Sequence, residues 1–168
     1  SHFNLQSPRI MMMATLGKAA GVAGAFVAGQ QVVIDYLIQT AKSYVYSTPA
    51  PPALSATLSA SVNIIAQGDA LRAHLYALIA LLKAELNLTK WQLMPSITSI
   101  QPLLIGDNFE AVRVSRFLQA KGILVPAIRP PTVPKNTARL RISLSAAHSK
   151  ADVMRLMSAL HEAEKEFS

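Results

Sequence analysis

The sequence has no cysteine, and only nine of its 168 residues are acidic. The absence of cysteine excludes disulfide bonds and any reaction that uses a thiolate. A hydrophobic run that could cross a membrane is not expected, because the longest charge-free stretch, residues 43–68, contains Pro49, Pro51 and Pro52 and many hydroxyl residues. A signal peptide is not expected either, since the first residues lack a basic region and an apolar core.

The scarcity of acidic residues leaves an excess of positive charge, with sixteen Lys and Arg and a formal net charge of +7. The cations are spread along the chain without interleaved aromatic residues, which argues against nucleic acid and favours phosphate or carboxylate ligands. Hydrophobic residues make up 51% of the chain and the mean hydropathy is +0.31, which is apolar for a soluble domain. We therefore expect some apolar surface to meet a partner chain or another part of the same protein.

The first part of the chain alternates short apolar runs with helical spacing. The patterns predict strands over residues 9–15 and 24–29, with Met11, Met12 and Met13 as strand core, and a helix over residues 30–41. Residues 44–52 are predicted to be extended, and residues 53–87 to form one long packing helix with buried leucines that include Leu71 and Leu78.

The second part predicts the order strand, helix, strand, strand, helix. Strands are expected over residues 97–105, 123–128 and 138–145, the last with Arg139 and Arg141 on its polar face. The first helix is expected to be capped by Asp107 or Asn108 and to end at Gly122, and the second to begin with a Ser149–Asp152 capping box. This order predicts a small α+β unit with helices on one face of its sheet.

Lys18 is isolated among glycine, alanine and methionine in the stretch MMMATLGKAAGVAGAFVAG. An apolar, partly desolvated setting favours the neutral amine that forms a Schiff base, and the hydroxyl of Thr15 could hold a phosphate. This combination suits pyridoxal phosphate. A glycine-rich phosphate loop looks similar, although the full P-loop pattern is not met because Ala19 follows Lys18. An exposed loop lysine is an equal alternative on these residues alone.

Four stretches together resemble the α-oxoamine synthases, namely TLGKAAGVAGAFVAG, YVYSTPAPP, QPLLIGDN and AIRPPTVPKNTARLRISLSAAH. The resemblance implies an α/β and α+β architecture, the carboxy-terminal part of a fold-type I pyridoxal phosphate enzyme. Residues 1–66 would be the end of its large cofactor-binding domain. Residues 67–168 would be its small domain, an antiparallel sheet with helices on one face, introduced by a long linking helix.

The resemblance also implies an activity and its partners. The expected reaction is a decarboxylative acyl transfer to L-alanine from pimeloyl-CoA or a pimeloyl-carrier protein, as in biotin biosynthesis. The enzyme is expected to be a cytoplasmic homodimer. Lys18 matches the Schiff-base lysine, which also acts as the base at the α-carbon, and Thr15 matches a phosphate-binding hydroxyl. Ser47 and Thr48 match a segment that reaches the phosphate in the neighbouring subunit, although they could simply begin a turn before the prolines.

Two arginines, Arg129 and Arg141, match family positions near the substrate carboxylate, with Thr132 beside them. A planar guanidinium can bind a carboxylate through two parallel hydrogen bonds, which agrees with this role. Surface solvation or an ion pair is the alternative, and Arg139 is expected to do only that. No metal site is expected, since His74, His148 and His161 lack ligand spacing and are interpreted as structural or solvated.

Other functions remain open on the sequence. A related α-oxoamine synthase could use glycine, form aminolevulinate or make sphingoid bases, and a non-catalytic assembly module could keep the same fold. Family members are considerably longer than this chain, and the aspartate that pairs with the pyridine nitrogen and the stacked aromatic residue precede the matching region. We therefore expect this chain alone to have little or no synthase activity.

Overall fold

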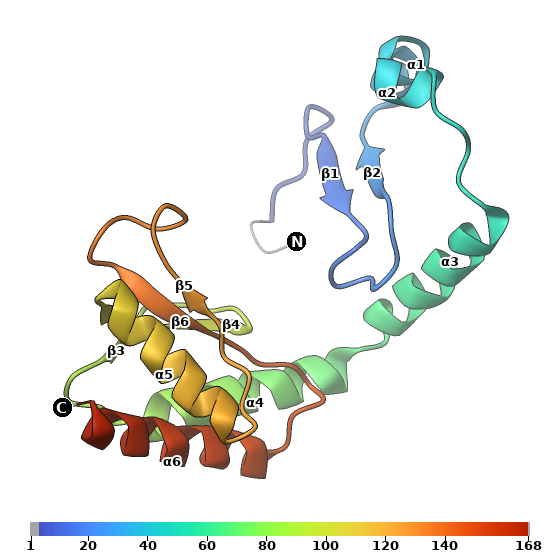
Figure 1. The fold of residues 1–168 in the computed structure, drawn as a ribbon. Coiled ribbons are helices and arrows are strands. Elements are labelled where there is room, and N and C mark those ends of the chain that lie inside the picture. The colour runs from blue at the N-terminus through green and yellow to red at the C-terminus, as the bar shows by residue number, and fades with distance from the viewer. Residues whose placement is uncertain (1–3, 168) are drawn as a thin grey trace. The chain divides into compact units, whose positions relative to one another are not determined.

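The computed structural model describes residues 4–167. Within them the chain packs as two compact units that divide between Gly68 and Asp69 (Figure 1). We call the residues up to Gly68 the first unit and those from Asp69 onward the second unit. The sequence-based boundary after residue 66, and the assignment of the two parts to a large and a small domain, stay predictions.

The first unit opens with an antiparallel hairpin of β1 (Met12–Thr15) and β2 (Ala25–Ala28). Both strands were expected, although the first begins three residues late, because a turn in which the Ile10 N–H donates to the Ser7 carbonyl precedes it. The prediction that Met11, Met12 and Met13 form a core is wrong, since these side chains are 60%, 54% and 71% exposed. No side chain of the two strands is buried, because a two-stranded hairpin alone offers no second layer.

Three helices follow, α1 (Gln31–Thr40), α2 (Lys42–Val45) and α3 (Pro52–Ala66). The first confirms the predicted helix. The prediction of an extended segment from residue 44 is wrong at its start, because the Ala41 carbonyl accepts from the N–H groups of Tyr44 and Val45 at 2.8 and 2.9 Å. A proline restricts its own backbone and that of the residue before it. Tyr44 and Val45 lie further from the first proline, Pro49, and are therefore free to be helical. Pro52 starts α3, where its missing N–H is not needed.

The long helix predicted over residues 53–87 is two helices, α3 and α4 (Asp69–Glu85), separated by a turn at Gln67 and Gly68. Glycine is unfavourable inside a helix by about 1 kcal/mol, and an acidic residue such as Asp69 is favoured in a first turn. The apolar spacing continues across the break and so concealed it. Leu78 is buried as predicted, whereas Leu71 is 54% exposed.

The second unit contains a four-stranded antiparallel sheet in the order β3-β4-β6-β5. Its elements after α4 are β3 (Gln92–Leu93), β4 (Ile100–Gly106), α5 (Asn108–Ala120), β5 (Ala127–Ile128), β6 (Ala138–Ser143) and α6 (Lys150–Glu166). The strand predicted over residues 123–128 is confirmed only at its end, because the Ile123 N–H donates to the Leu118 carbonyl at the end of α5. The two-residue strand β3 was not predicted, since it is too short to show a period.

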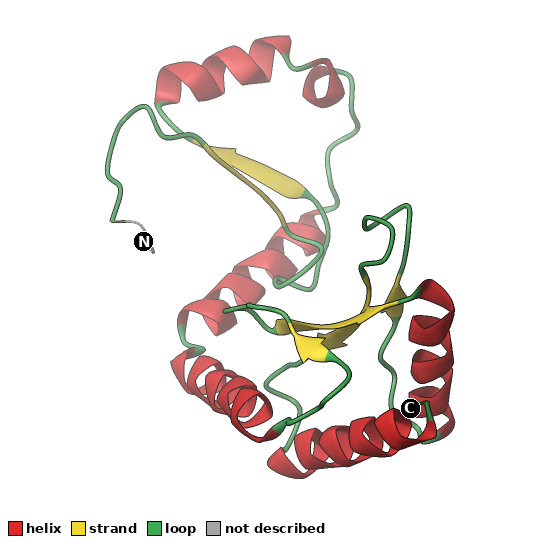
Figure 2. Ribbon diagram, turned by 90° about the vertical axis from the view of Figure 1, so that its left-hand side faces the viewer, coloured by secondary structure: helices red, strands yellow, loops and turns green. Residues whose placement is uncertain are grey.

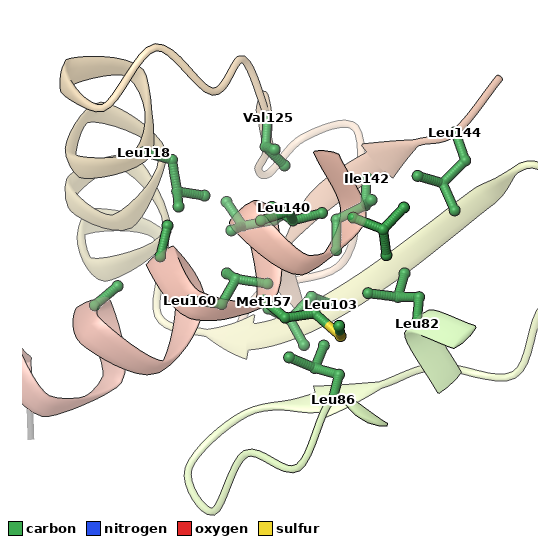
Figure 3. Close-up of a cluster of buried hydrophobic side chains, with 14 of the residues drawn as sticks. Leu82, Leu86, Leu103, Leu118, Val125, Leu140, Ile142, Leu144, Met157 and Leu160 are labelled. Atoms are coloured by element: carbon green, nitrogen blue, oxygen red, sulfur yellow. The ribbon is translucent and has the colours of Figure 1, made fainter. Parts of the chain in front are cut away.

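Helices α4, α5 and α6 cover one face of this sheet (Figure 2), which confirms the predicted α+β arrangement. The core lies between them and contains Leu82 of α4, Leu118 of α5 and Leu160 of α6 against Leu103 and Leu140 of the sheet (Figure 3). All five side chains are fully buried. The alternation along β6 therefore sends leucine and isoleucine to the helices and leaves the two arginines on the opposite face.

Both helix starts that the sequence predicts in the second unit are confirmed. The Asp107 carboxylate accepts from the Glu110 N–H at 2.8 Å, so Asp107 is the cap of α5. Ser149 and Asp152 form a reciprocal capping box at α6. Gly122, with φ of +74°, follows the end of α5 in the left-handed region that glycine adopts readily.

No helix within residues 4–167 is long and apolar enough to cross a membrane. The same residues contain no group of three or more His, Asp or Glu side chains arranged to hold a metal ion.

Candidate functional site

Lys18 lies in the loop that joins β1 to β2 (Figure 1). The loop is closed at its base, where the Leu16 N–H donates to the Gly24 carbonyl at 2.8 Å. At its tip the Lys18 carbonyl accepts from the Gly21 N–H at 2.9 Å, which makes Lys18 the first residue of a four-residue turn. Gly21 has a φ of +66°, so this turn uses the conformational freedom of glycine.

The surroundings of Lys18 differ from those that the sequence predicts. The residue is exposed, so the apolar, partly desolvated setting expected for its amine is not formed within the first unit. Thr15 is also exposed and ends β1, three residues before Lys18, so both belong to the same end of the hairpin. Their chemical roles stay predictions.

A hydrogen bond that sequence reasoning missed holds this loop. The Ser61 hydroxyl of α3 donates to the Ala20 carbonyl at 2.6 Å, and the bond is partly buried. Ala20 belongs to the turn that begins at Lys18, so α3 contacts the lysine loop directly. No local pattern could have revealed the bond, because the two residues are 41 positions apart.

Ser47 and Thr48 follow α2 and are exposed. The Ser47 hydroxyl donates to the Ser43 carbonyl, and its N–H donates to the Tyr44 carbonyl at 3.2 Å. The alternative interpretation as a turn before the prolines therefore has geometric support. To donate a hydrogen bond to a phosphate, the Ser47 hydroxyl would have to release the Ser43 carbonyl.

Arg139 and Arg141 project from the uncovered face of β6, two residues apart and therefore about 7 Å apart along the strand. Arg139 is tied locally, because its Nε and Nη2 donate to the carbonyl and hydroxyl oxygens of Thr137 at 3.0 and 3.1 Å. Arg141 is exposed, and its backbone N–H donates to the Pro126 carbonyl. Arg141 is thus the more available of the two guanidinium groups.

Arg129 and Thr132 belong to a turn directly after β5, in which the Thr132 N–H donates to the Arg129 carbonyl at 3.0 Å. The Pro130–Pro131 peptide bond inside this turn is cis. In the β5–β6 register Ile128 pairs with Arg139, and Arg129 is the next residue after this last pair.

The predicted site residues form two groups. Lys18, Thr15, Ser47 and Thr48 belong to the first unit, and Arg129, Thr132 and Arg141 to the second.

The ionisable groups with shifted pKa values have structural roles. The Ser149 backbone N–H and hydroxyl lower the pKa of Asp152, with help from His148 and Arg155, which is the electrostatic side of the helix cap. The ammonium of Lys121 lowers the pKa of Glu162 through a hydrogen bond of 2.6 Å.

The three histidines interpreted as structural or solvated each make hydrogen bonds to the backbone. His74 Nε2 bonds the His148 carbonyl at 2.9 Å, and His148 Nδ1 accepts from the Ser145 N–H at 3.0 Å. The His161 ring joins the carbonyls of Met157 and Asn87. These contacts support the structural interpretation.

Residues 2–160 match the family described as Aminotransferase class I and II. The 8-amino-7-oxononanoate synthase of Methylobacillus flagellatus is 58% identical over 164 residues, which are 98% of this chain and 41% of the relative. The synthase of Aromatoleum aromaticum is also 58% identical, over 95% of this chain and 42% of the relative. The chain thus spans about two fifths of the length of these curated relatives.

Solved structures agree with the fold. Serine palmitoyltransferase of Sphingomonas wittichii superposes with a TM-score of 0.85 at 25% identity, covering 93% of this chain and 40% of that one. The 8-amino-7-oxononanoate synthase of Francisella tularensis gives 0.77 at 26% identity, covering 94% and 45%. A further chain, at 0.80 and 23% identity and covering 93% and 40%, is described as holding pyridoxal phosphate as an internal aldimine.

Proposed function

Because the chain belongs to the aminotransferase class I and II family, we propose that it is the carboxy-terminal part of a pyridoxal phosphate-dependent 8-amino-7-oxononanoate synthase. The proposed enzyme condenses L-alanine with a pimeloyl thioester, releasing carbon dioxide and the thiol carrier. It acts as a cytoplasmic homodimer. The observation that carries the proposal is the 51–58% identity of several such synthases over nearly the whole chain.

The donors of the first unit fit two ends of the cofactor. Lys18 supplies an exposed amine for the aldehyde, and Thr15, at the same end of the hairpin, supplies a hydroxyl for the phosphate. Ser47 and Thr48 supply two further hydroxyls, proposed to serve the neighbouring subunit. For the pyridine nitrogen the first unit offers only one carboxylate, Asp35, which accepts a hydrogen bond from Gln31 on α1. The partner of that nitrogen is therefore expected from elsewhere in the enzyme.

Each of these residues has a separate role in the proposed reaction. The cofactor, when bound, accepts the electron pair left on the α-carbon of the amino acid. The Lys18 amine holds the cofactor and then takes the α-proton. Arg129 and Arg141 bind a substrate carboxylate, with the Thr132 hydroxyl beside them, and two parallel N–H groups of a guanidinium fix its plane.

Reductive trapping tests the proposal. The chain is incubated with pyridoxal phosphate at low concentration, reduced with borohydride, and mapped by mass spectrometry. We expect one adduct, on Lys18, that is lost in the Lys18→Arg variant. Lys42 is an exposed lysine of the same unit, so the Lys42→Arg variant should leave the adduct unchanged. Labelling spread evenly over the exposed lysines would contradict a cofactor role for Lys18 in this chain.

Turnover is the second measurement. We expect the chain alone to release little or no carbon dioxide from L-alanine and a pimeloyl thioester, and activity to appear when the remaining part of a synthase is supplied as a separate polypeptide. Comparing glycine and serine with L-alanine in that mixture distinguishes the related synthases. Preference for either of the other amino acids would overturn the assigned substrate.

A further inference from the structure

A cavity of about 230 Å³ lies in the second unit, between the connection from α5 to β5, the end of β6 and the first two turns of α6. Its floor consists of buried apolar side chains, namely Val125, Ile142, Leu144, Val153 and Leu156. The first three are labelled in Figure 3, where they belong to the buried cluster beneath the helices. None of the residues assigned to the cofactor or the substrate lines this cavity, so it is separate from the candidate site.

Arg155 forms part of the cavity wall and is held in place by the end of α5. Its Nη2 donates to the Lys121 carbonyl at 2.5 Å. A Cβ at position 122 would lie 3.0 Å from the same nitrogen, so Gly122 makes room for the guanidinium. The bond to Lys121 uses one of the five N–H donors of the group, and the others are left to bind a ligand.

His148 supplies a second donor to the wall. Its Nδ1 accepts from the Ser145 N–H at 3.0 Å, which places the proton of the neutral ring on Nε2. Among the described residues, none accepts a hydrogen bond from this Nε2. The one carboxylate in the wall, Asp152, already accepts from the N–H and the hydroxyl of Ser149. The wall therefore offers more free donors than free acceptors.

This combination selects an amphipathic ligand. Small-molecule sites in proteins join an apolar lining to a few placed polar groups, and the apolar floor suits a hydrocarbon chain. A guanidinium binds both oxygens of a carboxylate, which suits an acidic head. A second charge on the ligand would face the apolar floor without a partner, which disfavours dicarboxylates.

The volume limits the length of the chain. A water molecule takes about 30 Å³ of the liquid, so the cavity holds about seven or eight non-hydrogen atoms of similar size. A carboxylate accounts for three of these atoms, and the remainder corresponds to about four or five further carbons.

We propose that this cavity binds a short aliphatic monocarboxylate, with its chain over Val125 and Leu156 and its carboxylate between Arg155 and His148. The inference does not rest on the proposed function, because the residues that carry it are not those of the proposed reaction. A bound ligand connects α6 with the segment that follows α5, so it stabilises the second unit.

Titration of the isotope-labelled full chain with hexanoate, followed through the amide chemical shifts, tests the proposal. We expect saturable shifts at Val125 and Val153, none at Lys18, and a dissociation constant on the order of millimolar for so small a ligand. Arg155→Gln should weaken binding by about tenfold or more, since it removes charge-assisted hydrogen bonds. Arg116→Gln is the matched control, because Arg116 is an exposed arginine of α5 outside the cavity.

Two further comparisons separate the head of the ligand from its chain. Hexanol has the same chain without the carboxylate and should bind about tenfold more weakly or not at all. Leu124→Asp, at a rim position that is 82% exposed, should repel hexanoate and keeps the test valid if Arg155→Gln lowers stability.

Three results would overturn the proposal: no saturable shifts with hexanoate, equal binding of hexanol, or equal losses in Arg155→Gln and Arg116→Gln. Each is independent of the reductive trapping on Lys18. A Lys18 adduct without hexanoate binding removes only this inference, and hexanoate binding without the adduct removes only the cofactor role.

Discussion

Single carboxylates in this acid-poor chain stabilise particular helix ends. Asp152 accepts from both the N–H and the hydroxyl of Ser149, and the Asp107 side chain plays the equivalent part at α5. Sequence was sufficient to find both, because a capping residue and its partner are three positions apart and act locally. The charge of such a carboxylate also interacts favourably with the positive end of the helix.

The Asp152 cap predicts a pH dependence. Its pKa lies below the ordinary value of 3.8, so the stabilisation that it gives is complete above that value and is lost as the pH falls through the lower, folded-state pKa. Asp152→Asn should therefore lower the melting temperature at pH 7, and the difference from the parent chain should shrink below about pH 4. Thermal unfolding at pH 7 and pH 3 measures this.

Glu166→Asn, at the last residue of α6, is the matched control for that experiment. It removes one carboxylate from the same helix far from the capping box, so it should not reproduce the pH-dependent difference. An Asp152→Asn effect of equal size at both pH values would show that the charge of the cap is unimportant.

At the scale of elements, the hydrogen bond from α3 to the lysine loop predicts a positioning role for Ser61. Ser61→Ala leaves the Ala20 carbonyl without this donor and frees the turn that begins at Lys18. A neutral hydrogen bond contributes about 1 kcal/mol, so reductive trapping of pyridoxal phosphate on Lys18 should slow by about fivefold. Ser61→Thr retains a hydroxyl and should restore the rate.

Ser59 gives the control for this prediction. It lies on the same helix, and its hydroxyl donates only to the Ser55 carbonyl one turn earlier. Ser59→Ala should leave trapping unchanged. Equal slowing in Ser59→Ala and Ser61→Ala, or no rescue by Ser61→Thr, would indicate a general weakening of α3 and not a contact with the loop.

The elements also show what a sequence can and cannot predict here. The buried and exposed faces of β6 could be predicted from its alternating sequence, because Leu140 and Ile142 face three covering helices and Arg141 faces away. The break between α3 and α4 at Gly68 could not be predicted, because apolar residues keep helical spacing on both sides of the turn. Met12 failed as a core residue for another reason, since an apolar pattern predicts which face is buried only when a covering layer exists.

Only the local features of the candidate site residues could be predicted from the sequence. The lone lysine in a glycine-rich loop and the arginine on the polar face of a strand are visible locally, and the family resemblance singled out Lys18 and Arg141, whose roles stay predictions. The contact of Ser61 with the Ala20 carbonyl could not be predicted, because the two residues are 41 positions apart in the sequence. The exposure of Lys18 likewise follows from packing and not from its neighbours in sequence.

For the whole molecule, the difference in buried apolar side chains between the two units predicts which parts of the chain unfold locally first. The second unit buries a cluster that joins three helices to a sheet, whereas none of the helices of the first unit has a buried side chain. Local opening is governed by buried apolar contacts, so amides of β6 should be the slowest to exchange with deuterium. Amides of the β1–β2 hairpin should exchange faster by several orders of magnitude, because its hydrogen bonds are exposed at the surface. Hydrogen exchange followed by mass spectrometry on the peptides around Leu140 and Met13 checks this.

Adding pyridoxal phosphate should slow exchange in the hairpin and leave β6 unchanged, since a ligand held by Lys18 stabilises only the loop that contacts it. Comparable protection of both peptides in the free chain would refute the contrast, and slowing confined to β6 would place the cofactor on the wrong unit.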